Sequence, residues 1–85
     1  MRQIPYTSKL AYTKDQQPLA LDYFILVTDS EPEHYGAKIV EKNSGAQALA
    51  FHLTVCTDRI YDLMDKLVQN SVTPTGLEDV LADWL

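Results

Sequence analysis

The fold is decided by the stretch LALDYFILVT, residues 19–28 of an 85-residue chain. Side chains of a β-strand alternate between two faces, so residues two apart share a face. The odd-numbered positions of this stretch are all apolar, and they are Leu19, Leu21, Tyr23, Ile25 and Val27. Phe24 and Leu26 make the second face partly apolar as well, which is typical of a central strand. The pattern therefore predicts a strand in the middle of a sheet.

Further strands are predicted on both sides of this stretch. A looser alternation predicts a first strand over residues 6–13, and the polar residues 14–18 have the composition of a turn. After a polar loop over residues 29–34, alternation returns and predicts a strand over residues 35–42. Asn43-Ser44-Gly45 then favours a hairpin turn, because Asn and Gly tolerate positive φ.

Residues 46–56 fit two patterns. Their apolar residues match helical spacing at positions 46, 49, 50 and 53, and strand spacing at positions 49, 51, 53 and 55. The turn before the segment and the β-branched residues at its end favour a strand. The helix stays an alternative.

Two amphipathic helices are predicted over residues 58–70 and 75–85, where apolar residues recur at i, i+3, i+4 and i+7. Each apolar stripe needs a partner, and the sheet is the only large one. The sequence therefore predicts a single α+β domain over residues 1–85. Its architecture is a four-stranded, mostly antiparallel β-meander with two C-terminal α-helices packed on one face.

The helix starts carry their own signals. Thr57 or Asp58 is the expected N-cap of the first helix. Thr75 and Glu78 have the spacing of a capping box at the start of the second helix, and Pro74 just before them suits a helix start.

Charge and cysteine content restrict the function classes. Seven Lys and Arg against twelve Asp and Glu give a net charge of −5, which argues against nucleic-acid binding because that needs clustered basic side chains. The single cysteine, Cys56, cannot form an internal disulfide and indicates either a reducing compartment or a protein indifferent to redox conditions. No secretory signal is visible, and the longest apolar run, residues 23–27, is far short of a membrane span of about 20 residues. We expect a cytoplasmic protein without membrane contact.

His52 and Cys56 suggest the Cys–His pair of a nucleophilic enzyme. On a strand they share a face but lie roughly 13 Å apart, whereas a working pair needs about 3 Å. Only the helical alternative for residues 46–56 would make them neighbours. We therefore interpret Cys56 as a small buried residue and His52 as a partly exposed residue of the sheet.

Two further polar features have ordinary interpretations. Glu31, Glu33 and His34 form an acidic loop with too few convergent ligands for a metal site. Asp22 interrupts the most apolar strand, and a buried unpaired carboxylate would be costly, so we expect it to face water. We predict no catalytic residue, no cofactor and no metal.

The acidic surfaces of the two helices are the strongest candidate site. Residues 43–85 hold two basic and six acidic side chains. Asp79 and Asp83 are like charges four residues apart, and Asp83 lies near the negative end of its helix, where a cation would be preferred. We predict a docking surface for a basic partner, with an ordinary solvated face as the alternative. Its residues are Asp62, Asp65, Asp79 and Asp83.

Apolar residues supply two more candidates. Trp84 and Leu85 are expected to fix the C-terminus to the core, with an exposed anchor for a partner as the alternative. The sheet face opposite the helices would indicate dimerisation or ligand contact if it carries an apolar patch. The residues considered for that face are Phe24, Leu26 and, depending on register, Tyr6 or Tyr12.

A series of short motifs runs through the C-terminal part of the chain. They are Tyr35-Gly36, Asp58 opening a helix with Leu63, Leu67 and Asn70, Val72-Thr73-Pro74, and the closing LEDVLAD of residues 77–83. In these motifs the chain resembles a group of small uncharacterised proteins of Firmicutes, particularly gut Clostridia. The resemblance implies a bacterial cytosolic origin and no catalytic residue.

We therefore predict a small non-enzymatic protein-interaction or regulatory module. A homodimer is a structural option, since a chain this short buries a small core. One alternative is a small-molecule-binding domain or minor enzyme with a pocket between sheet and helices, using His52, Cys56 or Tyr35. Another is an acidic decoy of nucleic acid, whose binding to a basic protein would collapse with salt.

Overall fold

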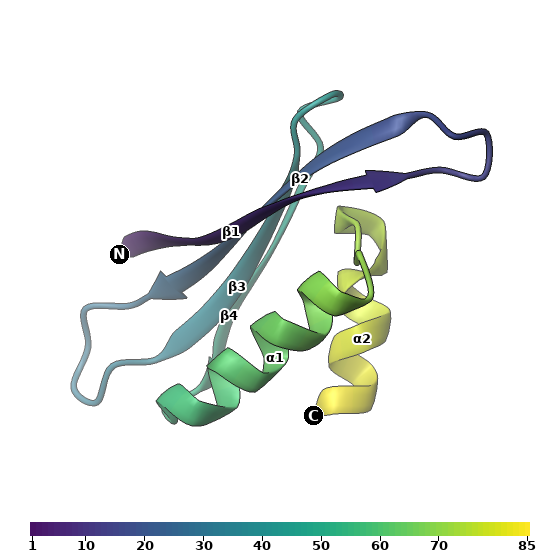
Figure 1. Cartoon of the computed structure of the whole chain (residues 1–85). Helices are drawn as coiled ribbons and strands as arrows, with labels where there is room; N and C mark the ends of the chain where they lie inside the picture. The colour runs from purple at the N-terminus through teal and green to yellow at the C-terminus, as the bar shows by residue number, and fades with distance from the viewer.

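The structure is a computed structural model that describes residues 1–85, and it confirms the predicted α+β fold (Figure 1). Four antiparallel strands form one sheet in the order β1-β2-β3-β4. The strands are β1 (Arg2–Tyr12), β2 (Pro18–Val27), β3 (Tyr35–Glu41) and β4 (Gln47–Thr54). They are followed by helix α1 (Thr57–Gln69), the 3₁₀ turn η1 (Pro74–Gly76) and helix α2 (Leu77–Trp84).

The main correction to the predicted boundaries concerns β1. This strand begins at Arg2, whereas the alternation predicted a start at residue 6. Residues 2–4 hold one apolar residue, Ile4, and they pair with the end of β2, as in Arg2↔Val27 and Ile4↔Ile25. Residues 46–56, which fitted both patterns, contain strand β4, so the helical alternative is wrong. The strand ends at Thr54, before the predicted residue 56.

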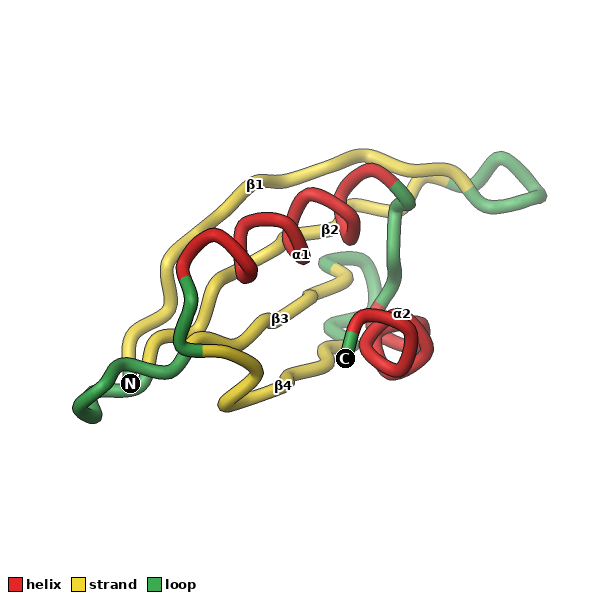
Figure 2. The backbone as a smooth tube through the Cα atoms, turned by 90° about the horizontal axis from the view of Figure 1, so that it is seen from below, coloured by secondary structure: helices red, strands yellow, loops and turns green.

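The core lies between the sheet and α1. Four odd-numbered residues of β2 are buried as predicted, and they are Leu21, Tyr23, Ile25 and Val27. The stripe of α1 packs against them with Ile60, Leu63, Met64 and Leu67, which are also buried. Figure 2 shows α1 along the β1–β2 side of the sheet and α2 near β4, with which it lines a cleft. Both helices thus cover one face, called the helix face below, and the opposite face is called the open face.

The predicted N-caps are wrong at both helices. Cys56 occupies the N-cap of α1, and no side chain caps it. Before α2 the chain makes the turn η1, with Thr73 as its N-cap and Pro74 in its first turn. Thr75 therefore lies inside a 3₁₀ turn and makes no capping hydrogen bond to α2.

The end of α1 is fixed by a Schellman motif. Ser71 has φ of 50°, and its N–H donates to the Val68 carbonyl at 3.1 Å, while the Val72 N–H donates to the Leu67 carbonyl at 2.9 Å. Buried Val72 and Leu67 supply the apolar contact that accompanies this motif. The Tyr23 hydroxyl donates to the Val72 carbonyl at 2.9 Å. The connection that leads to α2 is thereby tied to the central strand.

A close backbone approach shapes β4. The β3–β4 register shifts between Tyr35 and Ala37, opposite a segment of β4 where His52 has φ of 54°. A Cβ on Gly36 would lie 2.2 Å from the Ala50 carbonyl oxygen. Only glycine fits there, because the β4 backbone occupies the place of a side chain. Leu26, the Gly36 partner in β2, is 1% exposed although it lies on the open face.

Candidate functional site

Strand β4 forms one edge of the sheet and has no pairing partner on its outer side. Its sequence and its flanks, residues 43–57, contain no Asp, Glu, Lys or Arg. Three large apolar side chains are exposed along this segment: Leu49 at 42%, Phe51 at 43% and Val55 at 53%. An exposed apolar edge strand is a template on which another strand can pair.

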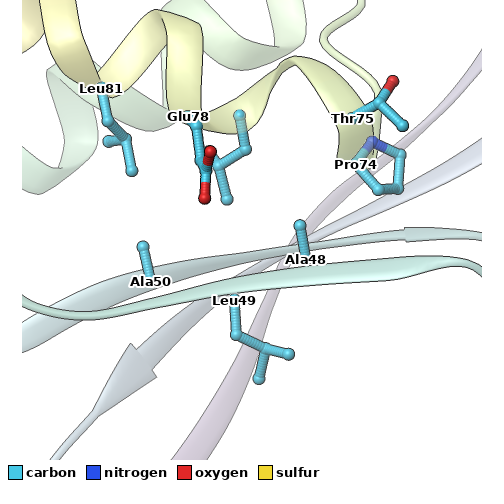
Figure 3. Close-up of a pocket in the computed structure, with 8 residues that line it drawn as sticks. Ala48, Leu49, Ala50, Pro74, Thr75, Glu78 and Leu81 are labelled. Atoms are coloured by element: carbon cyan, nitrogen blue, oxygen red, sulfur yellow. The ribbon is translucent and has the colours of Figure 1, made fainter.

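A cleft of about 610 Å³ lies beside this edge, between β4 and the start of α2. In Figure 3, Ala48 and Ala50 point from the strand toward the helix, and Leu49 points the opposite way. Glu78 and Leu81 point from α2 toward the strand. The remaining lining residues are Pro74, Thr75 and Leu77. The cleft exists because two alanines leave the space under α2 that larger side chains would fill.

Glu78 is the charged residue of this cleft. It is exposed, and it makes no ion pair with another side chain of the protein. Asp79 lies beside it in the first turn of α2, and the last turn of that helix has no basic residue. The cleft thus combines apolar walls with one unpartnered carboxylate.

The profile of a family of unknown function (DUF6514) matches residues 2–85. The chain belongs to this family. The match spans every strand and helix from β1 to α2, whereas the motifs noted in the sequence begin at Tyr35. No curated protein and no solved structure is matched by the chain.

The four aspartates predicted as a docking surface lie in different surroundings. Asp62 and Asp79 are exposed on α1 and α2 and make no ion pair. Asp65 accepts a hydrogen bond from the Tyr6 hydroxyl of β1, and this bond, with burial, raises the pKa of Tyr6 to about 12. Asp83 lines a second, smaller cleft between the ends of the two helices.

That second cleft has a volume of about 430 Å³ and includes Lys66 and Trp84. Arg59 stacks on the ring of Trp84, 4.5 Å from its centroid, and donates to its backbone carbonyl. Basic side chains of α1 therefore lie on the side of the helix that faces α2.

The structure does not join His52 and Cys56. Cys56 is exposed in the connection between β4 and α1, so the prediction that it is buried is wrong. His52 is exposed in the irregular part of β4, and its ring meets the ring of His34 edge-on at 5.1 Å between centroids. Tyr35 packs against the core. Neither cleft is lined by any of these residues.

The loop between β2 and β3 uses its polar groups within the fold. Arg2 forms an ion pair with Glu33 at 2.5 Å, and the Nδ1 atom of His34 lies 3.1 Å from the Ser30 hydroxyl. Glu31 is exposed. No three His, Cys, Asp or Glu side chains converge in a way that could hold a metal ion.

Asp22 is more covered than predicted, with a side chain 18% exposed. The Ser8 hydroxyl donates to it at 2.6 Å, and the Lys42 Nζ atom lies 3.4 Å from its other oxygen. The hydroxyl and the ammonium offset the cost of partly burying the Asp22 carboxylate on the open face of the sheet. Asp22 therefore stabilises the pairing of β1 with β2.

The remaining apolar candidates divide between the two faces. Trp84 packs against the core as predicted, but Leu85 is 75% exposed, so the prediction is wrong for that residue. Tyr6 contacts α1, and Tyr12 is 64% exposed. On the open face, the Lys38 ammonium lies 5.6 Å from the centroid of Phe24 and covers part of its ring.

No helix of the protein has the length and apolar character needed to cross a membrane. Sequence reasoning missed the β4 edge. It raised a pocket between sheet and helices as an alternative, but with His52, Cys56 or Tyr35 and not with the residues that line the cleft. The uncharged run of residues 43–57 is the signal that could have indicated the edge. The cleft had no comparable signal, because it depends on where η1 places α2.

Proposed function

We propose that the chain is a non-enzymatic protein-interaction module of a bacterial cytoplasm, and that it binds a partner protein by adding one strand of it to β4. The observation that carries this proposal is an unpaired, uncharged edge strand with Leu49 and Phe51 exposed on it. Strand addition supplies affinity through backbone hydrogen bonds and specificity through alternate side chains. The exposed thiol of Cys56 suits a reducing compartment.

The net charge of −5 favours a basic partner. Asp62 and Asp79, which have no ion pair of their own, are the aspartates of the predicted acidic surface that are free to contribute. Asp65 and Asp83 contribute less in this proposal. Asp65 already accepts a hydrogen bond from the Tyr6 hydroxyl, and Asp83 lines a cleft together with Lys66.

Site-specific photo-crosslinking in the producing bacterium tests the proposal. A benzophenone amino acid is placed at position 49 on β4 and, as the matched control, at position 10 on β1, which is also an exposed leucine on an edge strand. We expect a discrete protein adduct from position 49 and none from position 10. Adducts of equal yield from both positions, or from neither, would contradict strand addition at β4.

The crosslinked mass also separates two forms of the interaction. An adduct with the mass of two chains assigns β4 to a homodimer, whereas another mass assigns it to a different protein. Introducing Gly36→Ala in the same experiment displaces β4 and should abolish the position-49 adduct in either case.

A further inference from the structure

We infer that the strand received by β4 belongs to a different protein and carries a large apolar side chain for the cleft under α2, with a Lys or Arg two residues away for Glu78. This inference rests on the proposed strand addition and specifies the chemistry of the partner. It follows from the geometry of an added strand, the size of the cleft and its charge.

The geometry fixes which partner side chains meet the cleft. A strand paired with β4 lies about 4.8 Å outside it, and its side chains alternate between the same two faces. Those on the helix face therefore continue the row of Ala48 and Ala50, which point toward α2 (Figure 3). Successive side chains on that face are two residues apart in the partner.

Size complementarity selects a large apolar side chain. The cleft has a volume of about 610 Å³, which is in the range of pockets that bind ligands. Its walls are apolar at Pro74, Leu77 and Leu81, while the floor is made of alanines. A Leu, Met or Phe from the neighbouring strand would fill space that the protein's own small side chains leave.

Charge complementarity selects a basic neighbour. Glu78 points toward the strand from α2 and makes no ion pair within the protein. Asp79 next to it strengthens the negative potential, and no cation of this chain lines the cleft. A Lys or Arg on the added strand would place its charged group beside Glu78, while its carbon chain covers the apolar rim.

A second copy of the chain fits this site less well. Pairing β4 with β4 of another copy presents Ala48 and Ala50 again, which are too small to fill the cleft. The cleft of that copy brings the same Glu78 carboxylate, so the shared surface gains negative charge and no cation. Both arguments favour a partner of different sequence.

Peptide selection tests the inference directly. The wild-type protein is used to select from displayed random eight-residue peptides, and the selected peptides are measured against four variants with the fold checked by circular dichroism. The two cleft variants are Ala50→Leu and Glu78→Gln. Their matched controls are Ala82→Leu and Asp83→Asn, both at exposed positions of α2 outside the cleft.

We expect the selected peptides to share a large apolar residue with a Lys or Arg two positions away. Ala50→Leu should weaken their binding by about tenfold or more, and Ala82→Leu should not. Glu78→Gln should weaken it by about threefold to fivefold at low salt, since an exposed ion pair contributes little, and the apolar preference should remain. Asp83→Asn should change binding less than Glu78→Gln does.

Two outcomes would overturn the inference while leaving strand addition standing. One is selection of alternating peptides without the large apolar or the basic preference. The other is equal loss of binding in each cleft variant and its matched control. A position-49 crosslink to a second copy of the chain would also overturn it. Failure of strand addition itself is recognised separately, by the absence of any position-specific adduct at β4.

Discussion

The two edge strands of the sheet, β1 and β4, differ in how well they are protected from pairing with another chain. β1 is tied to the helix layer by polar side chains: the Tyr6 hydroxyl donates to Asp65, and the Lys9 ammonium donates to the Val68 carbonyl at 2.7 Å. β1 also contains Pro5 and a register shift between Pro5 and Thr7. β4 has neither proline nor charge, and the residues that point from it toward α2 are Ala48 and Ala50.

The difference indicates which edge is available for binding. Proline, charged side chains and irregular pairing are the features that protect an edge strand from pairing with another chain. All three occur in β1, whereas β4 has only the irregularity around His52. A sheet with one protected edge strand and one open edge strand is expected of a module that binds its partner through a single strand.

Gly36→Ala is the substitution that we expect to destabilise the open edge strand β4 most. The added Cβ would meet the Ala50 carbonyl oxygen at 2.2 Å, so β4 must move away from β3. We expect the free energy of unfolding to fall by about 3 kcal/mol, at the upper end for overpacking, as measured by urea denaturation. Gly76→Ala is the control, because its Cβ would meet only the Val72 side chain at 3.5 Å and the Thr73 hydroxyl at 4.0 Å, both ordinary van der Waals contacts. An equal loss in the two variants would show that the approach of β4 to Gly36 is not the cause.

Tyr23→Phe tests how α2 is held above β4. The Tyr23 hydroxyl is buried and donates to the Val72 carbonyl, just before η1. Without it that carbonyl loses its partner, and we expect a loss of about 1 to 2 kcal/mol in the free energy of unfolding. Native-state hydrogen exchange should show that α2 opens more readily than β1. Unchanged exchange in α2 would argue against this tether.

The same hydroxyl gives the stability a dependence on alkaline pH. Burial raises the pKa of Tyr23 from 10.0 to about 12 in the folded protein. The folded state therefore keeps its proton where the unfolded chain has lost it. The stabilisation is fully present below pH 10 and is lost as pH rises through 12. Urea denaturation of Tyr23→Phe over this range should show a shallower decline than that of the wild type.

Sequence reasoning predicted the elements and their arrangement, but not all of the element boundaries. The apolar stripes of the helices and the alternation of Leu21, Tyr23 and Ile25 identify a buried face directly. The spacing of apolar residues along one element is enough to show which of its faces is buried. The start of β1 at Arg2 depends on pairing with Val27, far along the chain. No local pattern encodes such a pairing, so the prediction began at residue 6.

The site was harder to predict for the same reason. Ala48 and Ala50 fit helical and strand patterns alike, and the space above them arises only when η1 sets the position of α2. The Thr75–Glu78 spacing pointed to a capping box, but Pro74 starts a 3₁₀ turn that places Thr75 away from the N-cap of α2. Glu78 is consequently free to point toward the strand (Figure 3).

Lys9→Met tests the polar attachment of β1. The substitution keeps most of the side-chain volume but removes the ammonium that donates to the Val68 carbonyl near the end of α1. We expect a loss of about 1 kcal/mol in the free energy of unfolding, because the lost hydrogen bond is partly buried and the cation lies near the negative end of a helix. Lys14→Met, at an exposed turn position, is the control. A loss of the same size there would assign the effect to net charge.

The smallest effect on stability, and the sharpest test of the contrast, comes from placing a lysine on each edge. Leu49→Lys and Leu10→Lys replace exposed leucines of β4 and β1, so each should change the free energy of unfolding by about 0.5 kcal/mol or less. Both change the net charge from −5 by the same amount, and any general charge effect on peptide binding is therefore equal. A charge on an edge strand opposes pairing with another strand, but only an open edge has pairing to lose. Binding of the peptides selected on the wild type should consequently be weaker for Leu49→Lys than for wild type, with Leu10→Lys unchanged. Equal behaviour of the two variants would mean that β4 is no more open than β1.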